Sequence, residues 1–236
     1  MDKKLIEVPK HLKSDFQKLF LVQRFKTYEG NILKDNTAEH TLRGIALINT
    51  LPFDDNSKDK VKAVFWPHDI PEIIISDYTA IEKLDEKLAK SLERKEDEAA
   101  KRLLNKQDYL MLNEFNVAAK ILKGERTEKI PSPEAVVAYV VDVVEGNTFF
   151  HRNITNWIVS DSYNPTHIPS EKALSYTFKM HALFVQNLPK CNLTAGYQKA
   201  AEYLLKFQLD EVAKAWVKVP LNLIPPTTLK GINENL

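Results

Sequence analysis

Apolar residues recur at intervals of three and four along most of the chain, and this spacing predicts amphipathic helices. A clear example is the stripe Leu84, Leu88, Leu92, Ala99 and Leu103. Helices are predicted to begin near Ser14, Val61 and Ser170, to end near Gly124, and to cover 37–51, 82–104, 135–145 and 198–217. Alternating β-branched runs between tight glycine turns are scarce. The pattern therefore predicts an all-α fold.

Local signals mark several helix ends. Ser14, with Gln17 three residues later, has the spacing of a capping box. The run Ser132-Pro133-Glu134 combines an N-cap residue, a proline at the first helical position and an acidic first turn. Pro67 and Pro71 predict a kink and a restart, since proline inside a helix costs roughly 3 kcal/mol. The polar stretch 52–59 is predicted to be a loop.

Composition excludes several kinds of enzyme. Only 6 of the 236 residues are glycine. They lie too far apart for a dinucleotide-binding GxGxxG or a phosphate-binding GxxxxGK loop. No serine occupies a GxSxG elbow. Cys191 is the only cysteine, which excludes an internal disulfide framework and a multi-cysteine zinc site.

Charge and hydropathy restrict the environment and the partners. Lys and Arg number 33 against 32 Asp and Glu, a formal net charge of +1, so no nucleic-acid partner is expected. No stretch approaches the roughly 20 apolar residues of a membrane span. The N-terminus lacks the apolar core of a signal peptide. We expect a cytoplasmic protein without membrane contact.

The domain organisation is expected to be simple, because the chain shows neither internal repeats nor a low-complexity linker. We predict one helical core over 1–190. Residues 191–236 are expected to add a C-terminal helix and a tail containing Pro and Asn, packed on that core. His151 and His181 lie on apolar helices and are interpreted as core residues.

Three anomalies interrupt this apolar pattern. Asp142 stands in the middle of an otherwise apolar helix, where a carboxylate is costly to bury unless it is paired or bound to a cation. His68 and Asp69 are adjacent at the end of another apolar helix, and His40 begins a third. Two His and two Asp on three core helices form a candidate N₂O₂ set for one divalent metal, with water completing the shell.

These residues also carry a resemblance. His40, then His68-Asp69, then a distant Asp142 is the order found in HD-domain metal-dependent phosphohydrolases. The segment from His68 to Asp77 resembles the HDxxE followed by GD of the branch that contains bacterial 5′-deoxynucleotidases. Ala38-Glu39-His40-Thr41 resembles the AEHS-like element of that branch. Arg24-Phe25 stands where that branch has Arg followed by an aromatic residue.

The sequence departs from this branch at two positions. Ser76 replaces the usual glycine before Asp77, so a different turn is expected there. Phe25 stands where the deoxynucleotidases typically have tryptophan, a residue implied in distinguishing deoxyribose from ribose. The resemblance covers roughly residues 14 to 150 and leaves the C-terminal third unexplained.

The resemblance implies an HD-domain helical bundle and a role for each residue of the site. The implied metal ligands are His40, His68, Asp69 and Asp142. Glu72 is implied as the general acid or base. Asp77, with Thr79 nearby, would hold the leaving group or sugar, and Arg24 would grip a phosphate. The mixed donor set suits Mn, Co, Fe, Ni or Zn better than Mg, which stays an alternative.

The function implied is release of phosphate from (deoxy)nucleoside 5′-monophosphates, with a nucleotide as the expected partner. Three alternatives stay open: a dNTP triphosphohydrolase, a signalling phosphodiesterase acting on a cyclic or dinucleotide, and a non-hydrolytic nucleotide-sensing module. Homodimer formation also stays open.

Overall fold

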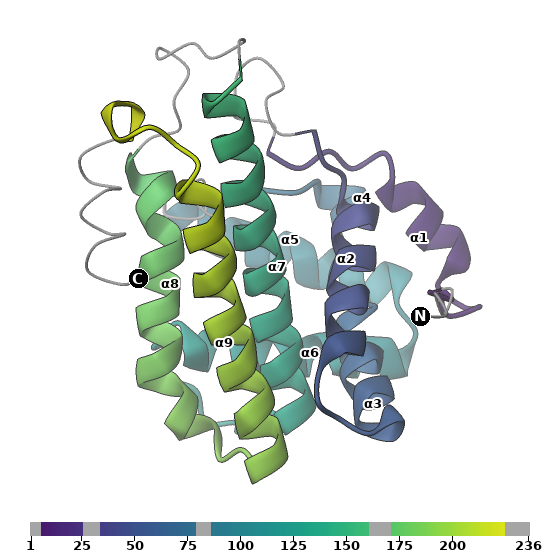
Figure 1. Ribbon diagram of the computed structural model, residues 1–236. Helices are drawn as coiled ribbons and strands as arrows, with labels where there is room; N and C mark the ends of the chain where they lie inside the picture. Colours follow the sequence, from purple (N-terminus) through teal and green to yellow (C-terminus); the bar gives the residue numbers. More distant parts are fainter. Residues whose placement is uncertain (1–5, 26–33, 79–85, 161–170, 225–236) are drawn as a thin grey trace.

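The computed structural model describes residues 6–25, 34–78, 86–160 and 171–224, and these residues form an all-α protein (Figure 1). This confirms the predicted fold class. The α-helices are α1 (Lys13–Leu19), α2 (Thr37–Thr50), α3 (Asp55–Phe65), α4 (Glu72–Ile75), α5 (Glu86–Leu103), α6 (Lys106–Leu122), α7 (Pro133–Ile158), α8 (Glu171–Asn187) and α9 (Ala195–Trp216). Short 3₁₀ turns follow α8 and α9, at Leu188–Cys191 and Leu221–Leu223. Within these ranges the only β pairing is an isolated bridge between Gln23 and Asn36.

Side-chain caps explain why several helices begin where they do. The Asn36 side chain accepts from the backbone N–H of Glu39 at the start of α2. The Asp54 carboxylate accepts from the N–H of Ser57 at the start of α3. Ser132 caps α7, with Pro133 in its first turn, as predicted. Each cap satisfies a backbone donor that the first helical turn leaves unpaired.

Some predicted boundaries are wrong. α3 begins at Asp55 rather than near Val61, because the capped polar residues form its first turn instead of a loop. α1 begins at Lys13 after Leu12, which makes no side-chain cap, so the capping box predicted at Ser14 is absent. α7 continues to Ile158, well past the predicted end at Glu145. The predicted helix starts at 82 and at Ser170 lie outside the described residues.

α7 is the central element of the core. Most of its side chains are buried, and it packs against α2, α3, α6 and α9. α9 runs along α7 for much of its length, and α8 stands beside them (Figure 1). Side chains on α7 therefore meet residues from several helices, so groups far apart in the sequence can gather at one site.

Gly44 allows α2 and α3 to approach closely. A Cβ built on Gly44 would overlap the Phe65 ring, which is fully buried. Since His40 lies one turn before Gly44 and His68 three residues after Phe65, this contact fixes the two histidine-bearing segments against each other.

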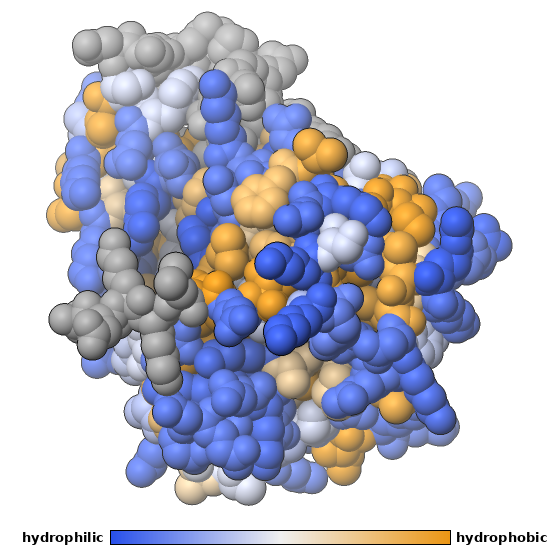
Figure 2. Space-filling view, turned by 90° about the vertical axis from the view of Figure 1, so that its right-hand side faces the viewer, coloured by the Kyte–Doolittle hydropathy of each residue, from blue (hydrophilic) through white to orange (hydrophobic). Residues whose placement is uncertain are grey.

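The outer surface differs from this core. The face that carries α1, α2 and α3 is largely hydrophilic, with apolar residues in separate areas among charged ones (Figure 2). None of the described helices combines the length and apolar character that a membrane span requires.

His151 joins the last three helices. It is fully buried on α7, its Nε2 lies 2.7 Å from Thr177 Oγ1 on α8, and the Trp216 indole N–H of α9 donates to its Nδ1 at 2.9 Å. Because Nδ1 accepts, the neutral ring carries its proton on Nε2 and donates to Thr177. Burial lowers the pKa of His151 to about 3.

This lowered pKa predicts a pH-dependent stability. An unfolded histidine titrates near 6.5, so between pH ~6.5 and ~3 the unfolded chain binds a proton that the folded chain excludes. The contribution of His151 is fully present above pH ~6.5 and is lost by about 1.4 kcal/mol per pH unit as the pH falls. We expect His151→Gln to be less stable at pH 7.5 but to show a flatter loss of stability between pH 7 and pH 5 in urea unfolding.

A control separates the titration from the packing. Thr177→Val removes one hydrogen bond but keeps the imidazole, so it should retain the pH slope of the parent protein. An unchanged slope in His151→Gln would contradict the assignment.

Candidate metal centre

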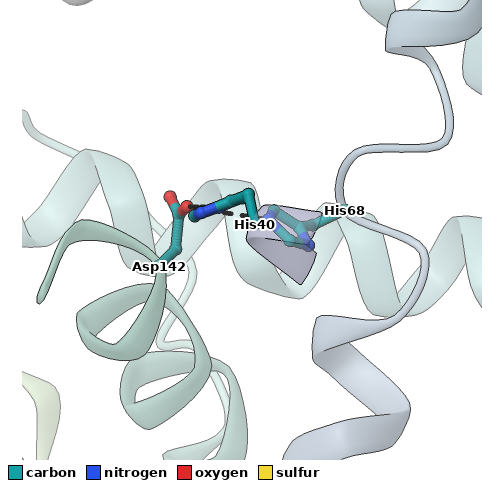
Figure 3. Close-up of side chains that lie close together, drawn as sticks. All are labelled: His40, His68 and Asp142. Atoms are coloured by element: carbon teal, nitrogen blue, oxygen red, sulfur yellow. Dashed lines mark hydrogen bonds and ion pairs between the residues drawn. The ribbon is translucent and has the colours of Figure 1, made fainter. Parts of the chain in front are cut away.

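His40, His68 and Asp142 converge at the middle of the bundle (Figure 3). They come from α2, from the turns between α3 and α4, and from α7. One ligand atom from each lies within 4.8 Å of the others. His40 Nε2 is 2.8 Å from Asp142 Oδ1, and His68 Nε2 is 3.6 Å from the same oxygen. Three residues separated by up to 102 positions thus direct their ligand atoms to one point.

The turn around Pro67 and Pro71 orients His68. α3 ends at Phe65, and the chain passes through turns before α4 begins at Glu72, which agrees with the predicted kink and restart. His68 Nδ1 lies 2.5 Å from the Phe65 carbonyl oxygen. A carbonyl only accepts, so Nδ1 carries the proton in the neutral ring and Nε2 presents its lone pair.

That lone pair has no hydrogen-bond partner among the described residues, although His68 Nε2 is buried. Buried polar atoms are nearly always paired, so an orphan aimed at another imidazole and a carboxylate indicates an absent ligand. Neutral imidazole nitrogen and carboxylate oxygen are common donors to divalent transition metals. The residues present therefore fit such an ion.

Asp69 borders this group. Its Oδ1 lies 3.1 Å from His68 Nε2, and its Oδ2 lies 3.9 Å from His40 Nε2. The Thr41 hydroxyl, one residue after His40, donates to Oδ2 at 3.1 Å. Asp69 is buried and faces both imidazoles, so its carboxylate adjoins the group formed by His40, His68 and Asp142.

The electrostatics show how the protein balances these charges without a metal. Burial alone would lower the pKa of His40, and so would the nearby Arg24 charge. Glu145 and the hydrogen bonds to Asp142 and Glu145 nevertheless raise it to about 10. Burial raises the pKa of Asp142, but the two imidazoles hold it well below its usual range. His40 is therefore cationic, and a bound divalent ion would replace that proton.

Arg24 and Asp77, the residues expected to bind phosphate and to hold the leaving group or sugar, lie close together. The Arg24 Nε is 3.7 Å from Asp77 Oδ2, and its Nη1 is 3.3 Å from Asp35 Oδ2. The same Nη1 is 3.9 Å from Glu145 Oε2. Burial lowers the pKa of the guanidinium, yet these carboxylates raise it above its usual value. Arg24 is thus a permanent cation close to His40, and both residues approach Glu145 Oε2.

Glu72 is the first residue of α4. Because the chain passes through turns between His68 and Glu72, the two residues do not lie on one continuous helix. The Thr37 hydroxyl donates to Glu72 Oε2 at 2.9 Å. Thr37 opens α2 three residues before His40, so the carboxylate is held against the helix that carries one histidine. Thr79 lies outside the described residues.

Ser76 adopts φ +66° and ψ 164°, a backbone conformation that glycine takes easily and other residues rarely adopt. The turn before Asp77 therefore has the positive φ that glycine favours, although a serine stands there. Phe25 also has a positive φ, of 55°, and its ring stacks on Phe149 with centroids 6.0 Å apart.

Glu145, Arg43 and Asp35 are neighbours of the site that the sequence analysis missed. Glu145 bonds to His40 Nδ1 and to Arg43 Nε. Arg43 also donates to both oxygens of Asp35, at 3.0 and 2.8 Å. Spacing offered a signal, because Glu145 follows Asp142 and Arg43 follows His40 by three residues, on the same helix faces. The sequence predicts that the helix ends at Glu145, so Glu145 was not predicted to face the site.

Comparison with known protein families matches residues 16–147 to the HD domain, and this match covers more than half of the chain. The chain belongs to the HD-domain family, whose members are typically divalent-metal-dependent phosphohydrolases. No curated protein and no solved structure matches it. The match extends from α1 into α7 and includes the charged residues described at this site, from Arg24 to Glu145.

We predict that His68→Ala abolishes stoichiometric metal binding, because the variant removes a buried nitrogen that faces Asp142 and has no hydrogen-bond partner among the described residues. Elemental analysis of purified protein after loading with Mn²⁺ and dialysis measures the effect. His181→Ala, which removes a half-buried histidine of α8, is the matched control and should keep its metal. One equivalent of metal retained by a folded His68→Ala protein would remove His68 from the ligand set.

Proposed function

We propose that this chain releases phosphate from (deoxy)nucleoside 5′-monophosphates, using one divalent metal held by His40, His68, Asp69 and Asp142. The observation that carries the proposal is the convergence of the His–His–Asp group with a buried arginine. Arg24 Nη1 and His40 Nδ1 both approach the same oxygen of Glu145, Oε2. An ion site and a guanidinium that close to each other suit a phosphate ester, which needs charge neutralised on its oxygens.

A bound metal of the Mn, Co, Fe, Ni or Zn type would lower the pKa of a coordinated water and neutralise charge on the phosphoryl group. Mg²⁺ is the alternative for this donor set. Around it the chain supplies the remaining functions. Glu72, oriented by the Thr37 hydroxyl, accepts the proton of the attacking water and returns it to the leaving oxygen.

Arg24 grips the phosphate, since a guanidinium offers two parallel N–H donors to phosphate oxygens. Asp77, 3.7 Å from the Arg24 Nε, is placed to accept from a sugar hydroxyl of the same substrate. Thr79 is proposed as a hydroxyl donor beside it.

The balance of charge favours a monophosphate over a triphosphate. Among the described residues in contact here, three cations, Arg24, Arg43 and the protonated His40, face five carboxylates: Asp35, Asp69, Asp77, Asp142 and Glu145. A triphosphate carries several more negative charges than a monophosphate, and like charges at close range repel. A single metal and one substrate-facing arginine match the smaller anion.

A shallow, open hollow on the surface beside Asp35 is proposed to take the nucleoside. It has a volume of about 530 Å³ and borders Asp35, the carboxylate that binds Arg24. Phe20 contributes an aromatic ring, and Gln23 and Asn36 contribute amides. A flat ring with amide donors and acceptors is the chemistry that holds a base by stacking and hydrogen bonding.

We predict that the metal-loaded protein releases orthophosphate from a panel of nucleoside and deoxynucleoside 5′-monophosphates in the presence of Mn²⁺ or Co²⁺. Phosphate release and nucleoside formation are both measured. Tripolyphosphate from dNTPs would indicate a triphosphohydrolase instead, and cleavage of cyclic or dinucleotides a phosphodiesterase. Nucleotide-dependent thermal stabilisation without any product would favour the sensing module.

Glu72→Gln tests the acid–base role separately from metal binding. The amide keeps the size of the side chain but cannot take a proton, so we expect turnover to fall by roughly 10²-fold or more at unchanged metal content. Glu125→Gln changes an exposed carboxylate in the turn after α6 and should leave turnover unchanged. A Glu72→Gln protein with the turnover of the parent would show that Glu72 transfers no proton.

A further inference from the structure

Glu145 lies one helical turn after Asp142 on α7, and its side chain is almost completely buried. Its two oxygens point in different directions. Oε2 accepts from His40 Nδ1, and Oε1 accepts from Arg43 Nε. The carboxylate therefore bridges the imidazole of α2 and a guanidinium of the same helix.

The contact with His40 determines which nitrogen faces the metal site. His40 Nε2 points at Asp142, from which it is 2.8 Å away, while Nδ1 points at Glu145. With Nδ1–H donated to a carboxylate, the neutral ring has its lone pair on Nε2, the atom that faces the site. A second hydrogen bond of this kind also fixes the rotation of the ring. The Phe65 carbonyl does the same for His68.

Glu145 is itself held on its far side. Arg43 binds both oxygens of Asp35, at 3.0 and 2.8 Å, and its guanidinium lies over the Phe149 ring at 4.1 Å. Asp35 also accepts from Arg24. A planar guanidinium held by a bidentate pair and a ring has restricted movement, so its bond to Glu145 restricts the position of that carboxylate.

We infer that Glu145 is a positioning residue. It sets the tautomer and orientation of His40 for the metal, and it holds that ligand in place relative to Arg24. The inference rests on the proposed function, because it takes His40 as a metal ligand. Stability alone is a weak explanation for the pair: buried ion pairs are often replaced by apolar groups without loss. Orientation of a ligand is a role that an apolar residue cannot supply.

The test compares metal affinity across variants of the full-length protein. Co²⁺ is titrated in competition with a chelator, and the visible absorption of the Co²⁺-loaded protein reports the ligand geometry. We expect Glu145→Ala to weaken Co²⁺ binding by about 10- to 100-fold and to change the spectrum. Glu145→Gln keeps an oxygen that accepts from Nδ1–H, and it should recover most of that loss.

Asp108→Asn is the matched control. Asp108 is another buried carboxylate beside a histidine, His11, but on α6, so its loss should lower stability without changing Co²⁺ affinity or the spectrum. Should Glu145→Ala fail to fold, Glu145→Asp keeps the charge while shortening the reach to His40, and it should weaken Co²⁺ binding in the same direction.

The inference is overturned if folded Glu145→Ala binds Co²⁺ with the affinity and spectrum of the parent, if Asp108→Asn weakens binding equally, or if the parent protein binds no Co²⁺. The proposed function fails separately. If Glu145→Ala shows the expected loss of Co²⁺ affinity but the parent protein hydrolyses no nucleotide, the role of Glu145 stands and the proposed substrate is wrong.

Discussion

Carboxylates that face inward from α7 impose the constraint on which the site depends. Asp142 and Glu145 lie one turn apart on a helix whose buried positions before Glu145 are mostly apolar. Carboxylates withdrawn from water at such positions need cations or donors in well-defined places, or burying them costs several kcal/mol. Without a metal, a protonated His40 provides that charge, and Arg43 and Arg24 provide the rest.

The same constraint links the proposed metal ligand His40 to the proposed phosphate-binding residue Arg24. His40 and Arg43 lie on one face of α2, and both contact Glu145. Asp35, just before α2, pairs with Arg43 and Arg24. A displacement of α2 would therefore disturb the proposed metal ligand and the proposed phosphate-binding arginine together. The close approach at Gly44 and Phe65 resists such a displacement, because close-packed cores leave little room to slide.

Much of the fold was predictable from the sequence because polar residues on apolar helices are visible without a structure. The periodicity predicted the all-α class, and His40, His68 and Asp142 interrupted it, so their convergence was predicted across 102 residues. The errors have local causes. The start of α3 was predicted too late in the sequence, because its first turn is polar and capped Asp and Ser residues resemble a loop. Glu145 was missed because charged residues near an expected helix end are usually solvated, and Arg43 because a charged residue within an amphipathic helix usually faces water. The positive φ of Ser76 could not be predicted, because a serine, unlike a glycine, does not indicate such a backbone conformation.

The central claim is that His40, His68 and Asp142 surround a single cation. Anomalous diffraction at the metal absorption edge, from crystals grown with Mn²⁺ or Co²⁺, tests it most directly. The predicted result is one strong anomalous peak about 2.1 Å from His40 Nε2 and His68 Nε2 and bound to an Asp142 oxygen. A fully occupied peak elsewhere, with His40 still bridging Asp142 and Glu145, would contradict it.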